Sequence, residues 1–75
     1  MDVQWNRQPI RGRILQLVRG QGSGFIRTED GRKLFFHRSD VMANAFNDLT
    51  VGDSVTGEVI PDRISGSRAV KVRKA

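Results

Sequence analysis

An alternating pattern in residues 22–41 constrains the fold of this chain more than any other part of its sequence. In Ser23–Thr28, and again in Lys33–His37, residue types alternate with a period of two, which indicates two strands. Residues 29–32 (EDGR) separate these strands, and an Asp-Gly pair is typical of a type I′ hairpin turn. The segment therefore predicts an antiparallel hairpin.

The predicted hairpin has one apolar face and one face of rings and cations. Ile26, Leu34 and Phe36 lie on the apolar face and are expected in the core. The opposite face is expected to carry Ser23, Phe25, Arg27, Lys33, Phe35 and His37. Exposed rings beside cations form a surface on which bases stack and to which phosphates bind. This face is therefore the candidate site for nucleic acid.

Three further segments, Ile10–Val18, Ser54–Ile60 and Arg68–Arg73, predict short strands. Gly12 in the first of them suggests a bulge or a sharp bend. In the second, the valines at positions 55 and 59 are expected to point inward. No amphipathic helix of useful length appears, so the sequence predicts an all-β, five-stranded antiparallel barrel, for which the OB-fold is the main candidate.

The segments that connect these strands are polar or rich in glycine. Residues 19–22 (RGQG) predict a turn, and Ser39 is placed to cap one helical turn that runs through Val41. Residues 42–50 predict a loop in which Phe46 is exposed and Leu49 enters the core.

Residues 1–9 are expected to form a flexible arm that ends at Pro9, and residues 10–75 are expected to form one small barrel domain. Trp5, the only tryptophan, lies in this arm. Two interpretations of Trp5 stay open: it packs against the side of the domain, or it contacts a ligand.

The composition narrows the classes of partner. The chain has 13 Lys and Arg against 8 Asp and Glu, and a small basic domain most often binds nucleic acid or anionic lipid. Lys71, Arg73 and Lys74 form a basic edge, for which a solvated edge that discourages strand pairing is favoured over direct contact. With no cysteine and no apolar run that predicts a signal peptide or a membrane span, we expect a cytoplasmic monomer with no membrane partner.

Catalysis and metal binding are not expected. The chain has no cysteine and a single histidine, His37, which cannot form a conventional zinc site, and no pair of carboxylates is placed for acid–base work. Residues 20–24 (GQGSG) superficially match a phosphate loop, but a strand follows them where a helix is needed, so we reject that interpretation. We therefore expect no cofactor, no small-molecule substrate and no enzymatic activity.

Two stretches resemble a known family. GSGFI at residues 22–26 and LFFHRSDV at residues 34–41 resemble the two nucleic-acid-binding signatures of the cold-shock domain family. The positions that also fit the family are Gly12, Phe46, Leu49 and Gly52. The resemblance covers roughly residues 10–75, and it implies a five-stranded OB barrel that binds single-stranded RNA or DNA on the face of its second and third strands.

The resemblance also implies which residues contact bases, and where this chain departs from the pattern. The positions that match are Phe25, Phe35, His37 and Phe46, whereas Gln16, Ser23 and Arg38 stand where the family has aromatic residues. Gln21 replaces a usual lysine, and Gly57 replaces a large apolar core residue. Each aromatic–base stack contributes about 1–3 kcal/mol. We therefore expect weaker and more salt-dependent binding, with arginines 27 and 38 compensating in part.

The expected function is the binding of single-stranded RNA or DNA with little sequence specificity, as an RNA chaperone or as a regulator of transcription or translation. The residues expected to make the contacts are Gln16, Ser23, Phe25, Arg27, Lys33, Phe35, His37, Arg38 and Phe46. Two alternatives stay open. One is an OB domain associated with the ribosome or with translation initiation that binds structured RNA, and the other is a protein-interaction module that has lost most of its nucleic-acid affinity.

Overall fold

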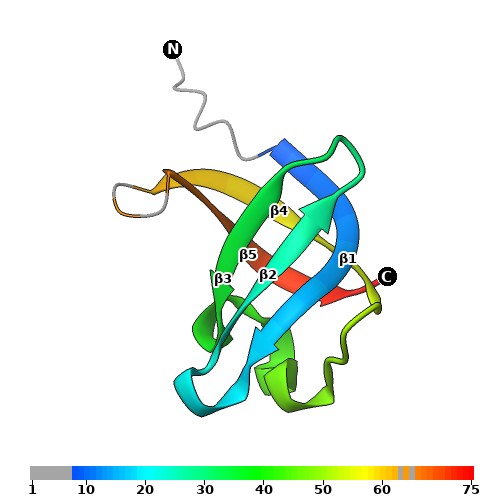
Figure 1. Ribbon diagram of the computed structural model, residues 1–75, viewed down its shortest axis with the longest axis vertical. Coiled ribbons are helices and arrows are strands. Elements are labelled where there is room, and N and C mark those ends of the chain that lie inside the picture. Colours follow the sequence, from blue (N-terminus) through cyan, green and yellow to red (C-terminus); the bar gives the residue numbers. More distant parts are fainter. Residues whose placement is uncertain (1–7, 63, 65) are drawn as a thin grey trace.

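The computed structural model describes residues 8–62, 64 and 66–75. Its strands close into a barrel in the order β1-β2-β3-β5-β4 (Figure 1). The strands are β1 (Gln8–Val18), β2 (Ser23–Thr28), β3 (Lys33–His37), β4 (Ser54–Asp62) and β5 (Gly66–Lys74). The predicted five-stranded barrel of the OB type is confirmed.

The sheet is mixed rather than purely antiparallel. Neighbouring strands run antiparallel everywhere except between β3 and β5, which run parallel where Phe35 pairs with Arg68. The strand order explains this exception. Because each strand runs opposite to the one before it in sequence, β3 and β5 point in the same direction, and closure of the barrel sets them side by side.

The two hairpin strands have the predicted bounds, and the other three are longer than predicted. β1 begins at Gln8, which pairs with Val59 of β4, so the strand starts two residues earlier than the sequence indicated. β4 extends to Asp62 and β5 spans Gly66–Lys74. The predictions for Trp5 and for the rest of residues 1–7 lie outside the described residues.

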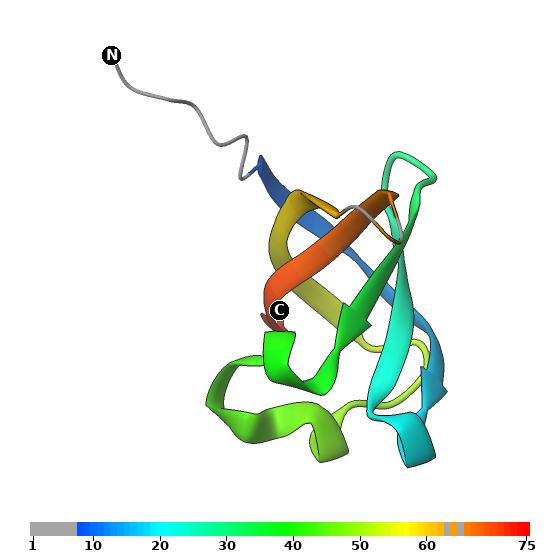
Figure 2. The ribbon, with the colours of Figure 1, turned by 90° about the vertical axis from the view of Figure 1, so that its left-hand side faces the viewer.

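Short 3₁₀ segments close one end of the barrel (Figure 2). They are η1 (Arg19–Gln21), η2 (Arg38–Asp40) and η3 (Met42–Asp48). The prediction that Ser39 caps a turn was wrong, because His37 is the capping residue. The Ser39 amide donates to His37 Nδ1 at 3.2 Å, and the His37 amide donates to the Asp40 carboxylate at 3.0 Å. In the described ranges no helix has the length and apolar character needed to cross a membrane.

Apolar side chains from all five strands and from the segment between β3 and β4 fill the barrel. The core consists of Ile10, Ile14, Ile26, Leu34, Phe36, Val41, Phe46, Leu49, Val55, Val59, Ala69 and Val72. The inward orientation predicted for the hairpin residues Ile26, Leu34 and Phe36 is confirmed, as is the burial of both valines of β4.

Phe46 belongs to this core, so the prediction that it is exposed was wrong. Only 3% of Phe46 is accessible, and its ring centroid lies 6.2 Å from that of Phe36. The segment was predicted as a plain loop, but it forms η3 with left-handed backbone at Ala43 (φ 59°) and Asn44 (φ 53°). These two residues and the non-helical Ala45 after them interrupt the helical turns before Phe46, and its ring packs at the end of the barrel that η3 closes.

A bulge in β1 lies at Leu15 rather than at Gly12. The pairing with β2 shifts between Ile14 and Gln16, which leaves Leu15 as the extra residue. This shift reverses the phase of the strand, so Ile14 and Leu17 both face the core while Gln16 faces outward. Alternation alone could not have assigned the two faces of this strand.

The hairpin turn is not of type I′. That turn needs a positive φ at two consecutive residues, and in residues 29–31 only Gly31 has one (φ 90°). The Gly31 amide donates to the Thr28 carbonyl at 3.0 Å, and the Asp30 carboxylate accepts from the Thr28 hydroxyl and from the Arg32 guanidinium. The hydrogen bond from Thr28, and after it the one from Arg32, lowers the pKa of Asp30 below its usual value of 3.8. Their contribution to stability is complete above that pH and is lost as the pH falls through the lowered pKa.

Candidate nucleic-acid interface

Two phenylalanine rings form the centre of the outer face of β1, β2 and β3. Phe25 of β2 pairs with Phe35 of β3, and Gln16 of β1 pairs with Phe25 on its other side. The two rings meet edge to face, with centroids 5.9 Å apart and planes at 68°. Both rings are half-buried, so each keeps accessible surface although the core lies on the opposite side of the sheet. The predicted outward orientation of Phe25 and Phe35 is therefore observed, and the exposed Gln16 lies beside Phe25 on the same face.

Cations flank the rings on the side nearer the hairpin turn. The Lys33 ammonium lies 4.6 Å from the centroid of the Phe25 ring, which is within the range of a cation–π contact. Lys33 pairs with Arg27, and Arg27 pairs in turn with Arg13 of β1, so three exposed cations form one row across the strands. Sequence reasoning missed Arg13, because the bulge at Leu15 hid which residues of β1 share this face.

His37 and Ser23 form the next pair on the opposite side of the rings. His37 is half-buried, and its Nδ1 lies 3.1 Å from the Ser39 hydroxyl, which leaves Nε2 for an outside partner. Ser23 is on the predicted face but is only 8% exposed. It therefore presents little surface for a contact.

The Arg38 side chain lies over the ring of Phe46, the residue that the sequence had predicted to be exposed. Its guanidinium carbon is 5.8 Å from the Phe46 ring centroid, and its side chain also passes close above Gly22, where an added Cβ would stand 2.9 Å from Arg38 Cδ. The Phe46 ring is therefore covered by Arg38 on one side and packed against Phe36 on another. The exposed group at this end of the face is Arg38 itself.

A partly buried ion pair, between the buried Asp40 and the half-buried Arg68, supports the far edge of the face. The Asp40 carboxylate accepts from Arg68 Nε at 3.1 Å and from Arg68 Nη2 at 2.9 Å, and it also accepts the His37 amide. Arg68 stands beside Phe35 across the parallel junction of β3 and β5. Sequence reasoning missed this pair because Asp40 and Arg68 belong to distant segments.

The described part of the chain brings together no group of three or more His, Cys, Asp or Glu side chains that could hold a metal ion.

Comparison with known proteins identifies the family. The model of the 'Cold-shock' DNA-binding domain matches residues 10–75. The chain belongs to the cold-shock domain family. Cold shock-like protein CspC of Buchnera aphidicola subsp. Acyrthosiphon pisum is 39% identical over 64 residues, which are 84% of this chain and 91% of that protein. Cold shock-like protein CspE of the same organism is 39% identical over 51 residues, 67% of this chain and 74% of that protein.

Membership of the cold-shock domain family supports nucleic-acid binding and a chaperone-like role, in a family of binding proteins rather than enzymes. Within this cold-shock domain, the three positions that lack the family's rings have different environments. Gln16 is exposed beside Phe25, Ser23 is buried, and Arg38 covers Phe46. Among residues 8–62, 64 and 66–75, the accessible rings of the face are thus those of Phe25, Phe35 and His37.

Replacing Asp40 with alanine is expected to lower the free energy of unfolding of this cold-shock domain by about 2–3 kcal/mol, because it removes a buried acceptor of several charged hydrogen bonds. Urea denaturation measures the change. The matched control is Lys74→Ala, which breaks the more exposed pair with Asp53 (3.6 Å) and is expected to cost less than about 1 kcal/mol. Equal losses in the two variants would contradict a structural role for the Asp40–Arg68 pair.

Proposed function

We propose that this chain binds single-stranded RNA or DNA with little sequence specificity on the outer face of β1, β2 and β3, and that it keeps strands accessible as an RNA chaperone or as a regulator of transcription or translation. The observation that carries this proposal is the pair of half-buried rings, Phe25 and Phe35, on the outside of a sheet whose core side is already filled. An apolar pair in that position has no role in the core.

Bases stack on this pair because every base has a flat face, and this accounts for the low specificity. In this structure the Lys33 ammonium lies over one face of the Phe25 ring. A base that stacks there displaces the ammonium, which is then free to meet the phosphate of the same nucleotide. Arg13 and Arg27, in the same row, supply further phosphate contacts. His37 extends the stacking surface toward η2.

Arg38 and Phe46 act as one unit in this proposal. A base reaches Phe46 only if the Arg38 side chain moves away, and Arg38 can instead stack on the base as a guanidinium plane. We therefore assign the contact at this end of the face first to Arg38 and only second to Phe46. Gln16 contributes a hydrogen bond rather than a stack, and Ser23 contributes least because it is buried.

A salt titration with a pyrimidine oligonucleotide tests the proposal. The logarithm of the association constant is expected to fall linearly with the logarithm of the salt concentration, with a slope of about −2 if Arg13, Arg27 and Lys33 each meet one phosphate of a single strand. A hairpin RNA of the same length serves as the comparison. Tighter binding of the hairpin would favour an OB domain for structured RNA, and no binding of either probe at low salt would favour a protein-interaction module.

A further inference from the structure

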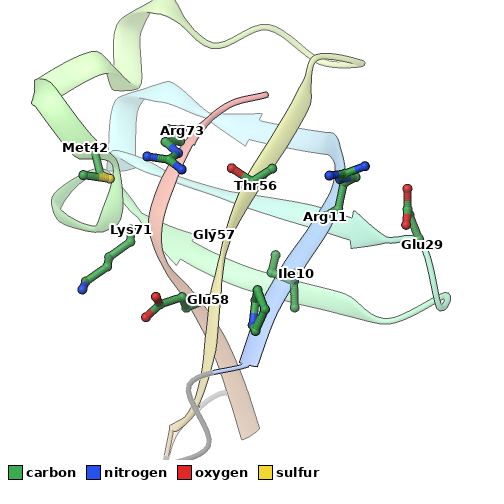
Figure 3. A pocket seen from close by; sticks show the side chains of 10 residues that line it. Ile10, Arg11, Glu29, Met42, Thr56, Gly57, Glu58, Lys71 and Arg73 are labelled. Atoms are coloured by element: carbon green, nitrogen blue, oxygen red, sulfur yellow. The ribbon is translucent and has the colours of Figure 1, made fainter.

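A groove of ≈510 Å³ lies on the outer face of β1, β4 and β5, away from the two phenylalanine rings. Figure 3 shows β4 passing between its two walls, with Arg11 on the side of β1 and with Lys71 and Arg73 on the side of β5. Thr56 and Gly57 of β4 line the groove between these cations.

The backbone of β5 is distorted beside this groove. The pairing of β4 with β5 shifts between Thr56 and Glu58, and Lys71 has a left-handed conformation (φ 53°) inside the strand. That conformation costs a residue other than glycine about 1–2 kcal/mol. The bulge also brings β4 so close to β5 that position 57 suits glycine, because a Cβ there would lie 2.8 Å from the Val70 carbonyl oxygen. Strained backbone of this kind clusters at functional sites, and here it sets a lysine on the wall of a groove.

The three cations of the groove are available to an anion. No ion pair joins Arg11, Lys71 or Arg73 to another residue in the described part of the chain. Of the two carboxylates that line the groove, Glu58 already has a partner, and Glu29 lies at one end, beyond Arg11 (Figure 3). Three cations and two carboxylates therefore line the groove, which leaves positive charge in excess.

A second hollow connects this groove with the proposed binding face. It has a volume of ≈240 Å³, and its lining includes Arg11, Arg13 and Arg27. Arg11 also lines the groove, and Arg13 and Arg27 belong to the row of cations beside the rings. Arg27, Arg13 and Arg11 thus lead from the face, across β1, to the groove on the other side of the barrel, and Glu29 also lines both hollows.

We propose that a single strand leaving the phenylalanine pair crosses β1 along Arg27, Arg13 and Arg11, and that its phosphates end in the groove at Lys71 and Arg73. This inference rests on the proposed function and adds a second contact surface to it. A short oligonucleotide covers the face alone, and a longer one reaches the groove. This assigns two of the three basic residues of β5, Lys71 and Arg73, to direct contact, where the sequence had favoured a merely solvated edge.

The test compares two oligothymidylates of about 6 and about 16 nucleotides, within the range of site sizes of OB folds. For Arg73→Gln the salt slope with the longer probe is expected to become shallower by about 0.7, which corresponds to one lost phosphate contact on a single strand. The slope with the shorter probe is expected to stay the same. Arg11→Gln provides a second variant with the same expectation.

Lys74→Gln is the matched control, because Lys74 is the exposed neighbour of Arg73, carries the same charge and pairs with Asp53. Equal effects of the two substitutions, or an equal effect of Arg73→Gln on both probes, would show only general electrostatic attraction and overturn the inference. If the wild-type chain binds neither probe, the proposed function itself fails, so the two failures are distinguishable.

The amide resonances of Thr56 and Gly57 provide a readout of position. They are expected to shift with the longer probe and to stay in place with the shorter one. If these resonances shift with the shorter probe, and two molecules of that probe bind each protein, the groove is an independent site. That result would overturn the proposal that one strand runs continuously from the rings to the groove.

Discussion

We expect the double variant Phe25→Ala/Phe35→Ala to bind a single-stranded oligonucleotide at least about 30-fold more weakly than the wild-type chain. Each lost stack costs about 1–3 kcal/mol, so the pair contributes about 2 kcal/mol at the least. Fluorescence anisotropy of a labelled oligothymidylate at fixed, low salt measures the change. Equal affinities of the variant and the wild-type chain would refute the stacking role of this face.

The barrel of this variant should stay folded, because both rings lie outside the core. Each ring is half-buried and they contact each other edge to face, so some stability is lost with them, of the order of 1 kcal/mol beyond the area that they bury. Binding is therefore measured well below the unfolding midpoint of the variant. Ile64→Ala is the control, since this side chain is 95% exposed and belongs to the connection between β4 and β5.

Gly12→Ala is expected to cause the largest loss of stability of any small substitution in the chain, about 3 kcal/mol or more. A Cβ at Gly12 would stand 2.3 Å from the Arg27 carbonyl oxygen and 2.9 Å from Thr28 Cα. Both obstacles are backbone atoms of β2, which is held by its pairing with β1 and β3, so neither can move aside cheaply. For a small domain such a loss is a large part of the total free energy of unfolding.

Gly20→Ala is the matched control for this prediction. Nothing lies within 4 Å of a Cβ at that position, and the residue has no positive φ. Its effect on the free energy of unfolding, measured by urea denaturation, is expected to stay within about 0.5 kcal/mol. If both substitutions had the same small effect, the close approach of β1 and β2 at Gly12 would not limit the barrel.

Local sequence predicted most of the hairpin and little of its surroundings. The bounds of β2 and β3 and the orientation of Phe25 and Phe35 follow from a period of two, which any strand with one buried face must obey. The turn type was wrong because Asp-Gly also suits a loop in which only Gly31 has a positive φ. The face of β1 stayed open because a bulge changes the period without leaving a clear signal in sequence.

The errors at the edges of the site have one cause. The contacts of Phe46 with Phe36 and Arg38, and the Asp40–Arg68 pair, depend on how separate elements meet in the barrel. A phenylalanine in a polar loop looks exposed until η3 turns it toward Phe36, and Arg38 then covers the ring. No local pattern carries that information, because the contacts form only after the chain has closed.

By itself, the sequence determined a small barrel whose β2–β3 hairpin places rings and cations on one face, because alternation and glycine turns are local properties. The tertiary structure alone decided which of these groups are accessible. The bulge in β1 brings Arg13 into the row of cations, Arg38 covers Phe46, and the distorted pairing of β4 with β5 sets Lys71 and Arg73 around a groove. Register and burial are properties of the closed barrel, and the proposed path of a nucleic-acid strand depends on both.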